Sequence, residues 1–296
     1  MNRGIFFAIG AYVLWGLLPV YWKWLHHVPA LQVLCHRIVW SFLTLLAAVV
    51  LSRQWYVFRQ AGISLRVLRV YTMAALLISI NWFTYIWAVE AGFIIETSLG
   101  YFINPLFSVF LGVIFFRERL RPFQWAAITV AAIGVIYLTI AYGTLPWIAL
   151  TLAGTFGAYG LVKKIAPLGS LFGLTLETGV MILPALFFLG YSVASGRGVF
   201  FHARVFTDLL LLGTGFITMI PLLLFSSAAR RIPLSLIGIL QYIAPILQFL
   251  LGVLIYREPF NTVKCIGFGI VWVALIIYGV EGFLTFRGQS FPVMSV

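Results

Sequence analysis

The chain has 296 residues, of which 63% are hydrophobic and 9% are charged, and its mean hydropathy is +1.09. This composition excludes a soluble globular domain and indicates a polytopic membrane protein. A net charge of +12 can indicate a nucleic-acid binder, but here the basic residues follow the ends of apolar segments and form no single stripe. We therefore expect membrane lipid, and not nucleic acid, as a partner of this chain.

Apolar runs of about 20 residues predict ten transmembrane helices in chain order. The first run is longer than a signal-peptide core and no small-residue cleavage site follows it, so we expect it to stay attached. The connections are short and leave no room for a soluble domain. The helices are expected at 4–25, 30–51, 71–91, 94–116, 122–140, 144–163, 170–192, 207–229, 234–256 and 261–284.

The fourth and ninth predicted helices share one sequence pattern. The segment SLGYFINPLFSVFLGVIFFRER at 98–119 returns as GILQYIAPILQFLLGVLIYREP at 238–259, shifted by 140 residues. Each copy belongs to a half with an odd number of helices, so the second half must cross the membrane in the opposite sense. We therefore predict an all-α membrane protein with two inverted five-helix repeats, at 1–142 and 143–296, as in secondary transporters.

The distribution of Lys and Arg predicts the orientation in the membrane. With the N-terminus inside, thirteen of them fall on the inner side and five on the outer side, while Arg37 lies within a helix. Basic residues concentrate on the cytoplasmic side of membrane proteins. Both termini are therefore expected in the cytoplasm.

Pro105 and Pro245 lie near the centres of the fourth and ninth predicted helices, where each ring displaces a helical hydrogen bond to the carbonyl four residues earlier. Either these are packing kinks, or they mark a substrate site near the middle of the membrane. Around each proline, small and polar residues recur at steps of three and four and so share one helix face. That face is expected to line a cavity or a tight seam. Its members are Ser98, Tyr101, Pro105, Ser108 and Gly112, and Gly238, Gln241, Pro245, Gln248 and Gly252.

Arg37 and Glu177 are ionisable residues within predicted spans, and they are also 140 residues apart. Buried unpaired charges are costly, so we expect these two to pair or to share a polar network. The pair would either lock the two halves together or serve in gating or proton transfer. Glu96 opens the fourth helix, where a carboxylate is favoured by the helix dipole, and is the third gating candidate.

Several aromatic and amide side chains lie deep within the predicted spans. They predict a cavity that stacks on apolar or aromatic substrates, although packing against lipid is the alternative for any one ring. Asn81 matches Pro221 under the 140-residue shift, so a backbone interruption is expected at that depth in at least one half. Apart from the prolines, the candidates are Tyr12, Trp15, Asn81, Trp82, Tyr101, Asn104, Tyr159, Gln241 and Tyr242.

Other patterns predict neither a metal nor a cofactor. The four histidines lack the spacing of a metal site, and Cys35 and Cys265 fit buried thiols. Gly154, Gly157 and Gly160 resemble part of a nucleotide loop, but no soluble strand precedes them, so close helix packing explains them better. The chain has no Walker-type loop, so ATP hydrolysis is not expected.

The segments HRIVWSF (36–42), NWFTYIWAVEAG (81–92), ETSLGYFINPL (96–106) and QYIAP (241–245) resemble the RarD branch of the EamA-type permeases, within the drug/metabolite transporter superfamily. The resemblance covers nearly the whole chain, and names in this branch refer to chloramphenicol sensitivity. It implies a bacterial inner-membrane permease whose cavity is lined by the first, third, fourth, sixth, eighth and ninth helices. It also implies that the peripheral fifth and tenth helices are candidates for a homodimer interface. The binding residues that carry over are Asn81, Trp82, Tyr101, Asn104, Gln241 and Tyr242.

These patterns favour a secondary permease that moves a small organic metabolite or drug-like compound, with amino-acid-like and aromatic compounds as candidates, by alternating access. The alternative is a scaffold or receptor subunit that transports nothing and has a well-packed interior. A membrane-embedded enzyme would need converging catalytic groups. The seven acidic residues are spread along the whole chain and offer no such group.

Overall fold

The computed structural model describes residues 2–53, 64–116, 120–202, 204–229, 231–232 and 240–289, which form helices and their connections without a strand. Seven of the described helices, α1, α2, α4, α6, α8, α9 and α12, are long and apolar enough to span a membrane. The all-α prediction is therefore confirmed. The elements are α1 (Asn2–Trp24), α2 (Ala30–Leu51), α4 (Leu65–Glu90), α5 (Ile94–Phe116), α6 (Pro122–Tyr142), α7 (Trp147–Ile165), α8 (Ser170–Ala194), α9 (Val205–Ala229), α11 (Ile243–Leu250), the π-helical turn η1 (Leu251–Ile255) and α12 (Thr262–Gln289).

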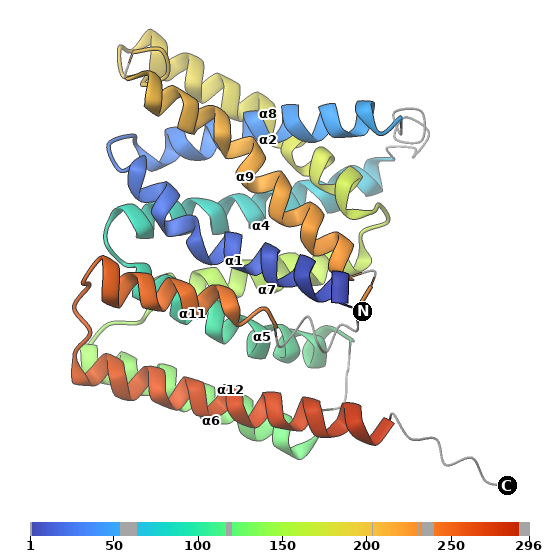
Figure 1. Cartoon of the computed structure of the whole chain (residues 1–296), viewed down its shortest axis with the longest axis vertical. Helices are drawn as coiled ribbons and strands as arrows, with labels where there is room; N and C mark the ends of the chain where they lie inside the picture. The colour runs from blue at the N-terminus through green and yellow to red at the C-terminus, as the bar shows by residue number, and fades with distance from the viewer. Residues whose placement is uncertain are drawn as a thin grey trace, which may run out of the picture.

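The helices lie side by side with their axes running across the view of Figure 1, and successive helices run in opposite directions. Helices α2 and α8 lie at the top of that view, and the pair α6 and α12 lies at the bottom. Between them, α1 packs against α9 and α11, while α7 packs against α4 and α5. The middle of the bundle is therefore enclosed by helices from both ends of the sequence.

Glycines allow two of these helix pairs to approach closely. A Cβ atom at Gly16 of α1 would lie 2.8 Å from Leu247 of α11, and one at Gly157 of α7 would lie 2.8 Å from Phe107 of α5. Leu247 and Phe107 are equivalent under the 140-residue shift. Gly157 thus serves close helix packing, as expected from the sequence.

The region of the ninth predicted helix differs from the expectation. Residues 233–239 lie outside the described part, and α11 begins at Ile243, so Pro245 lies in its first turn and not at a helix centre. The carbonyl of Gln241 accepts a hydrogen bond from the Ala244 amide at 3.3 Å. The first turn of a helix tolerates proline because its amides have no helical acceptor. By contrast, α5 continues through Pro105.

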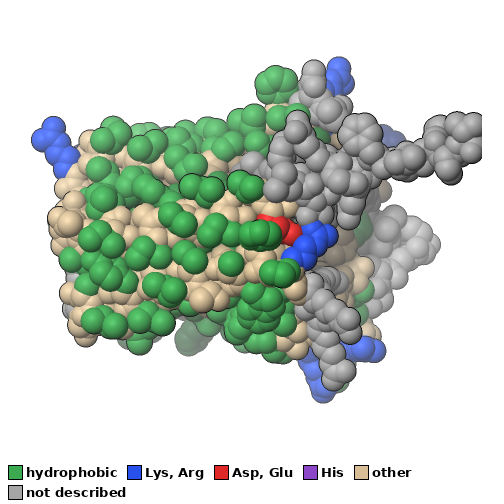
Figure 2. All heavy atoms as spheres, turned by 90° about the horizontal axis from the view of Figure 1, so that it is seen from below, with side chains coloured by type: hydrophobic (Ala, Val, Ile, Leu, Met, Phe, Trp, Pro, Cys, Tyr) green, Lys and Arg blue, Asp and Glu red, His purple; other side chains and the backbone are tan. Residues whose placement is uncertain are grey.

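The α6 and α12 pair forms the apolar face at the bottom of the bundle. Figure 2 views this face and shows hydrophobic side chains spread over it. Ile136, Ile140, Ile276 and Val280 are among its exposed members. Such a face suits contact with acyl chains. The homodimer interface expected on the same two helices stays a prediction.

Candidate functional site

An arginine lies buried in the middle of the bundle. Arg37 of α2 is only 4% exposed. Its Nε donates a hydrogen bond to Thr218 Oγ1 of α9 at 3.1 Å. The guanidinium carbon lies 3.9 Å from the centre of the Trp82 ring of α4 and 5.2 Å from that of Trp22 of α1. Two indole faces therefore hold the cation, which is the arrangement of a cation–π site.

Two tyrosines complete this group. Tyr85 of α4 lies within electrostatic range of Arg37, as does Tyr101 of α5, and the two rings meet edge to face with centroids 5.6 Å apart. We call Trp22, Arg37, Trp82, Tyr85, Tyr101 and Thr218 the Arg37 cluster. Five different helices thus contribute to one small polar and aromatic centre.

The Arg37 cluster contains buried hydrogen-bonding groups that have no partner among the described residues. These groups are Nη1 of Arg37, the hydroxyl of Tyr85 and Nε1 of Trp22. Buried polar groups in proteins are nearly always hydrogen-bonded, so each exception requires an explanation. A ligand-binding site, in which the ligand supplies the hydrogen-bond partners, is one such explanation.

Glu177 of α8 lies in a second cluster. Its Oε1 is 2.7 Å from Lys163 Nζ of α7, and its Oε2 accepts a hydrogen bond from the Tyr159 hydroxyl at 2.9 Å. The Lys163 ammonium also lies 5.4 Å from the centre of the Tyr71 ring. We call Tyr71, Tyr159, Lys163 and Glu177 the Glu177 cluster. Both carboxylate oxygens of Glu177 are therefore engaged within the protein.

Arg37 and Glu177 do not form the direct pair that was one of the two expectations, because each residue contacts a different set of partners. A series of ring contacts runs between the two clusters. Tyr101 meets Phe156 at 6.4 Å between centroids, and Phe156 meets Tyr159 at 6.1 Å. The 140-residue shift relates the two positions along the sequence, and this relation does not require that they touch.

The predicted amide candidates have different surroundings. Asn81 is buried in α4, and its Nδ2 donates to the Leu152 carbonyl and to Thr155 Oγ1 of α7, both at 3.0 Å. It therefore joins two helices. Asn104 of α5 is also buried, but its Oδ1 has no partner among the described residues.

The remaining predicted aromatic residues form a separate group between α1, α9 and α11. Tyr12 and Trp15 lie 5.5 Å apart, and both contact Phe225. The Trp15 carbonyl accepts a hydrogen bond from Gln248 Nε2. Tyr242 is partly buried, with a hydroxyl that has no partner in the described part of the chain. The aromatic candidates thus fall into two groups. Trp82 and Tyr101 lie near Arg37 and Tyr159 lies near Glu177, whereas Tyr12 and Trp15 lie near α11.

Charged residues connect four helices at one end of the bundle, which we call the Lys23 end. Glu96 of α5 pairs with Lys264 of α12 at 3.2 Å. Lys23 of α1 donates to the Glu90 carbonyl at the end of α4 at 3.4 Å. These contacts hold together helices that belong to both halves of the chain.

Glu258, also at the Lys23 end, forms the cap of α5. Its two oxygens accept hydrogen bonds from the Ile94 and Ile95 amides, each at 2.8 Å. Burial raises the pKa of this carboxyl, while the two amides, Lys23 and Lys264 act in the opposite direction. The sequence predicts Glu96 at the start of this helix, whereas Glu258, which lies within the repeated segment at 238–259, provides the cap. Only the tertiary structure shows this contact.

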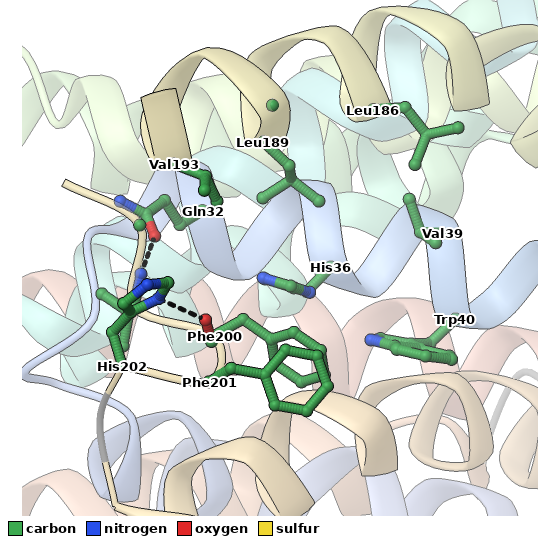
Figure 3. A pocket seen from close by; sticks show the side chains of 13 residues that line it. Gln32, His36, Val39, Trp40, Leu186, Leu189, Val193, Phe200, Phe201 and His202 are labelled. Atoms are coloured by element: carbon green, nitrogen blue, oxygen red, sulfur yellow. Dashed lines mark hydrogen bonds between the residues drawn. The ribbon is translucent and has the colours of Figure 1, made fainter. Parts of the chain in front are cut away.

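A cavity of about 430 Å³ lies between α2, α8 and the loop at 198–202. Figure 3 shows His36 and Trp40 of α2 facing Phe200 and Phe201 of that loop, with Leu186 and Leu189 of α8 opposite. The lining is almost entirely apolar. A smaller cavity includes Glu96, Trp147 and Lys264. None of the predicted substrate-binding residues lines either cavity.

Within the described residues, no three His, Cys, Asp or Glu side chains lie close enough together to hold a metal ion. Cys35 is buried and Cys265 is exposed, and both are free thiols. The expectation that both thiols are buried is therefore wrong for Cys265.

Comparisons with known proteins agree with this architecture. The model of the EamA-like transporter family matches residues 2–140. One crystal structure of a protein that is 20% identical superimposes with a TM-score of 0.57 over 95% of this chain and 98% of that chain. At this identity the likeness concerns the fold alone.

Curated relatives cover almost the whole chain. The uncharacterized transporter YojE of Bacillus subtilis (strain 168) is 46% identical, covering 94% of this chain and 93% of that protein. Protein RarD of Streptomyces exfoliatus is 43% identical, covering 97% and 91%. The chloramphenicol-sensitive protein RarD of Pseudomonas aeruginosa is 31% identical, covering 98% and 97%. The chain is thus a multi-pass membrane transporter that belongs to the RarD branch of the EamA-type permeases.

Proposed function

We propose that this chain is a secondary permease that moves a small organic compound across the bacterial inner membrane by alternating access around the Arg37 cluster. The observation that carries the proposal is a buried polar centre, with hydrogen-bonding groups left free, that is built by five helices from both halves of the chain. Transporters with inverted repeats bind substrate at such a place between the halves.

The helix contacts support two inverted five-helix halves, one of α1, α2, α4, α5 and α6 and the other of α7, α8, α9, α11 with η1, and α12. In this assignment α1 is equivalent to α7, and α5 is equivalent to α11. The contact of α1 with α11 then matches that of α7 with α5, and the contact of α1 with α9 matches that of α7 with α4. Contacts that match in this way are what a two-fold axis between the halves produces.

The Lys23 end supplies the contacts that alternating access would have to break. Glu96 pairs with Lys264, and Glu258 caps α5, so polar contacts join the first and second halves there, next to the apolar contact of Gly252 with Ile95. Such contacts can be exchanged for water when that end opens. The π-helical turn at Leu251–Ile255 ends three residues before Glu258, and such turns are frequent at functional sites.

Flux into proteoliposomes tests the proposal. The purified chain is reconstituted, and uptake of a panel of small amino acids, aromatic compounds and chloramphenicol is measured with and without an imposed pH gradient. We expect uptake above that of empty vesicles, with a large loss in Trp82→Ala. Trp125→Ala is the matched control, because Trp125 of α6 is 45% exposed and lines neither cavity. If the folded wild-type protein gives no uptake of any compound, the scaffold or receptor alternative replaces the permease.

The orientation has its own test. The positive-inside pattern predicts that both termini and residues 53–69 lie on the cytoplasmic side. A single cysteine at position 60, in a variant without Cys35 and Cys265, should react with a membrane-permeant maleimide and not with an impermeant one in intact cells. Labelling by the impermeant reagent would reverse the orientation.

A further inference from the structure

Arg37 carries a buried positive charge that has no negatively charged partner among the described residues. Of the seven acidic residues, six lie in the described part. Glu96 and Glu177 pair with lysines, Glu281 pairs with Arg121, and Glu258 caps α5. Asp208 accepts a hydrogen bond from the Phe201 amide, and Glu90 lies at the Lys23 end. None of these six pairs with Arg37, and Glu118 lies outside the described residues.

Such a charge is unfavourable at this depth. An arginine cannot lose its proton in a protein, and an uncompensated charge within a membrane costs several kcal/mol unless water or a counter-ion reaches it. The Trp82 ring covers one face of the Arg37 guanidinium, and Nε donates its hydrogen bond to Thr218. Nη1 remains available for another acceptor.

The free donors around Arg37 favour an anion. Arg37 Nη1, the Tyr85 hydroxyl and Trp22 Nε1 are all buried, and each residue is less than 5% exposed. All three can donate hydrogen bonds. A guanidinium beside further donors is the usual protein partner of a carboxylate or phosphate group.

We propose that the transported compound carries a carboxylate that binds Arg37 Nη1 and the Tyr85 hydroxyl, and that its apolar or aromatic body lies against the indole and phenol rings of the Arg37 cluster. This inference rests on the permease proposed above. A carboxylate fits better than a phosphate monoester, since one guanidinium neutralises a single negative charge. A dianion would leave one charge uncompensated among aromatic rings.

A purely structural role for Arg37 makes a different prediction. In that case Arg37 only ties α2 to α4 and α9, and organic acids and their neutral amides bind equally poorly. The two roles can therefore be separated by comparing an acid with its own amide, because the pair has nearly the same shape and differs in charge.

The test measures thermal unfolding of the purified full chain in detergent. The probes are benzoate, phenylacetate and indole-3-acetate, each beside its amide, with phenyl phosphate as the phosphate arm. We expect at least one acid to raise the unfolding temperature in a saturable way, while its amide and phenyl phosphate do not. Arg37→Lys should weaken the binding of that acid about tenfold or more, because the planar fork is lost.

Tyr85→Phe keeps the ring and removes one donor, so it should weaken binding about three- to tenfold, and it serves if an Arg37 variant fails to fold. Tyr191→Phe, on the exposed face of α8, is the matched control and should leave binding unchanged. The proposal is overturned if no acid stabilises the protein, if amides or phenyl phosphate stabilise it equally, or if Arg37→Lys and Tyr85→Phe both keep wild-type affinity.

Flux in proteoliposomes is read separately, so the two proposals fail in different ways. Transport of neutral compounds without any preference for acids would contradict the carboxylate proposal but agree with the permease proposal. Saturable binding of an acid without flux of that acid or of any panel compound would contradict the permease proposal and indicate an anion-binding protein.

Discussion

Arg37 and Glu177 hold equivalent positions in the two halves, and α2 and α8, which carry them, pack against each other. Yet their surroundings differ. Glu177 is 1% exposed, and both of its oxygens are engaged by Lys163 and Tyr159. Arg37 is equally buried but stacks on indole rings and meets no carboxylate among the described residues.

The difference indicates that polar residues at matching positions of the proposed repeats have different roles. In the Glu177 cluster the protein itself supplies the counter-charge, which is typical of a contact that stabilises the structure. In the Arg37 cluster no described residue supplies a counter-charge. Substitutions in the Glu177 cluster should therefore act mainly on stability, and substitutions in the Arg37 cluster should act mainly on ligand binding.

The largest expected effect on stability comes from Glu177→Gln. Removing the carboxylate leaves the Lys163 charge without its partner. Because the Lys163 side chain is 22% exposed, we expect a loss of about 3 kcal/mol in the free energy of unfolding, at the lower end for a buried pair. SDS-induced unfolding in mixed micelles measures this. The double variant Lys163→Met with Glu177→Leu should recover much of the loss.

The pair of Arg121 and Glu281 is the matched control for this prediction. It has a similar distance of 2.9 Å, but its arginine side chain is 50% exposed. Glu281→Gln should therefore cost less than about 1 kcal/mol. An equal cost in both pairs would show that burial does not distinguish the Glu177 cluster.

Tyr159→Phe should have a smaller effect in the same cluster. It removes the hydroxyl that donates to Glu177 Oε2 at 2.9 Å while keeping the ring. We expect a loss of about 1.5 kcal/mol, as for hydrogen bonds to charged groups. If the same change has no effect in the Glu177→Gln background, the two residues act through one contact, and the double-mutant cycle would measure its strength.

Glu258 offers a carboxylate that is engaged by backbone amides instead of a lysine. Glu258→Ala should cost about 1 kcal/mol, as for the loss of a helix cap. Because burial raises the folded-state pKa of Glu258, its contribution is fully present below the unfolded-state pKa and decreases as pH rises through the folded-state pKa. Unfolding measured from acid to neutral pH should therefore show a weaker pH dependence in Glu258→Gln than in the wild type.

Arg37→Gln should change stability least. The variant loses the stacking on Trp82 but also removes an uncompensated buried charge, so we expect a change of less than about 1 kcal/mol. Binding of organic acids should nevertheless be lost. A destabilisation as large as that of Glu177→Gln would instead place Arg37 among the structural residues and remove the difference between the clusters.

The sequence alone determined the membrane environment, most helix positions, the family and the close packing at Gly157. These features are local or repetitive, because hydropathy depends on about 20 consecutive residues and the repeat is read along the chain. The sequence also identified Arg37 and Glu177 as buried residues of interest. Tyr159 and Lys163 are four residues apart and so share a helix face, a signal that was available but not used.

Only the tertiary structure decided which side chains meet. The partner of Glu177 lies on α7 and that of Arg37 on α9, and these choices depend on how each helix is rotated about its axis. The 140-residue shift relates positions along the chain, and the two positions of such a pair need not touch in the folded protein. The same reason applies to Glu258, whose role depends on where the turn after η1 meets the first turn of α5.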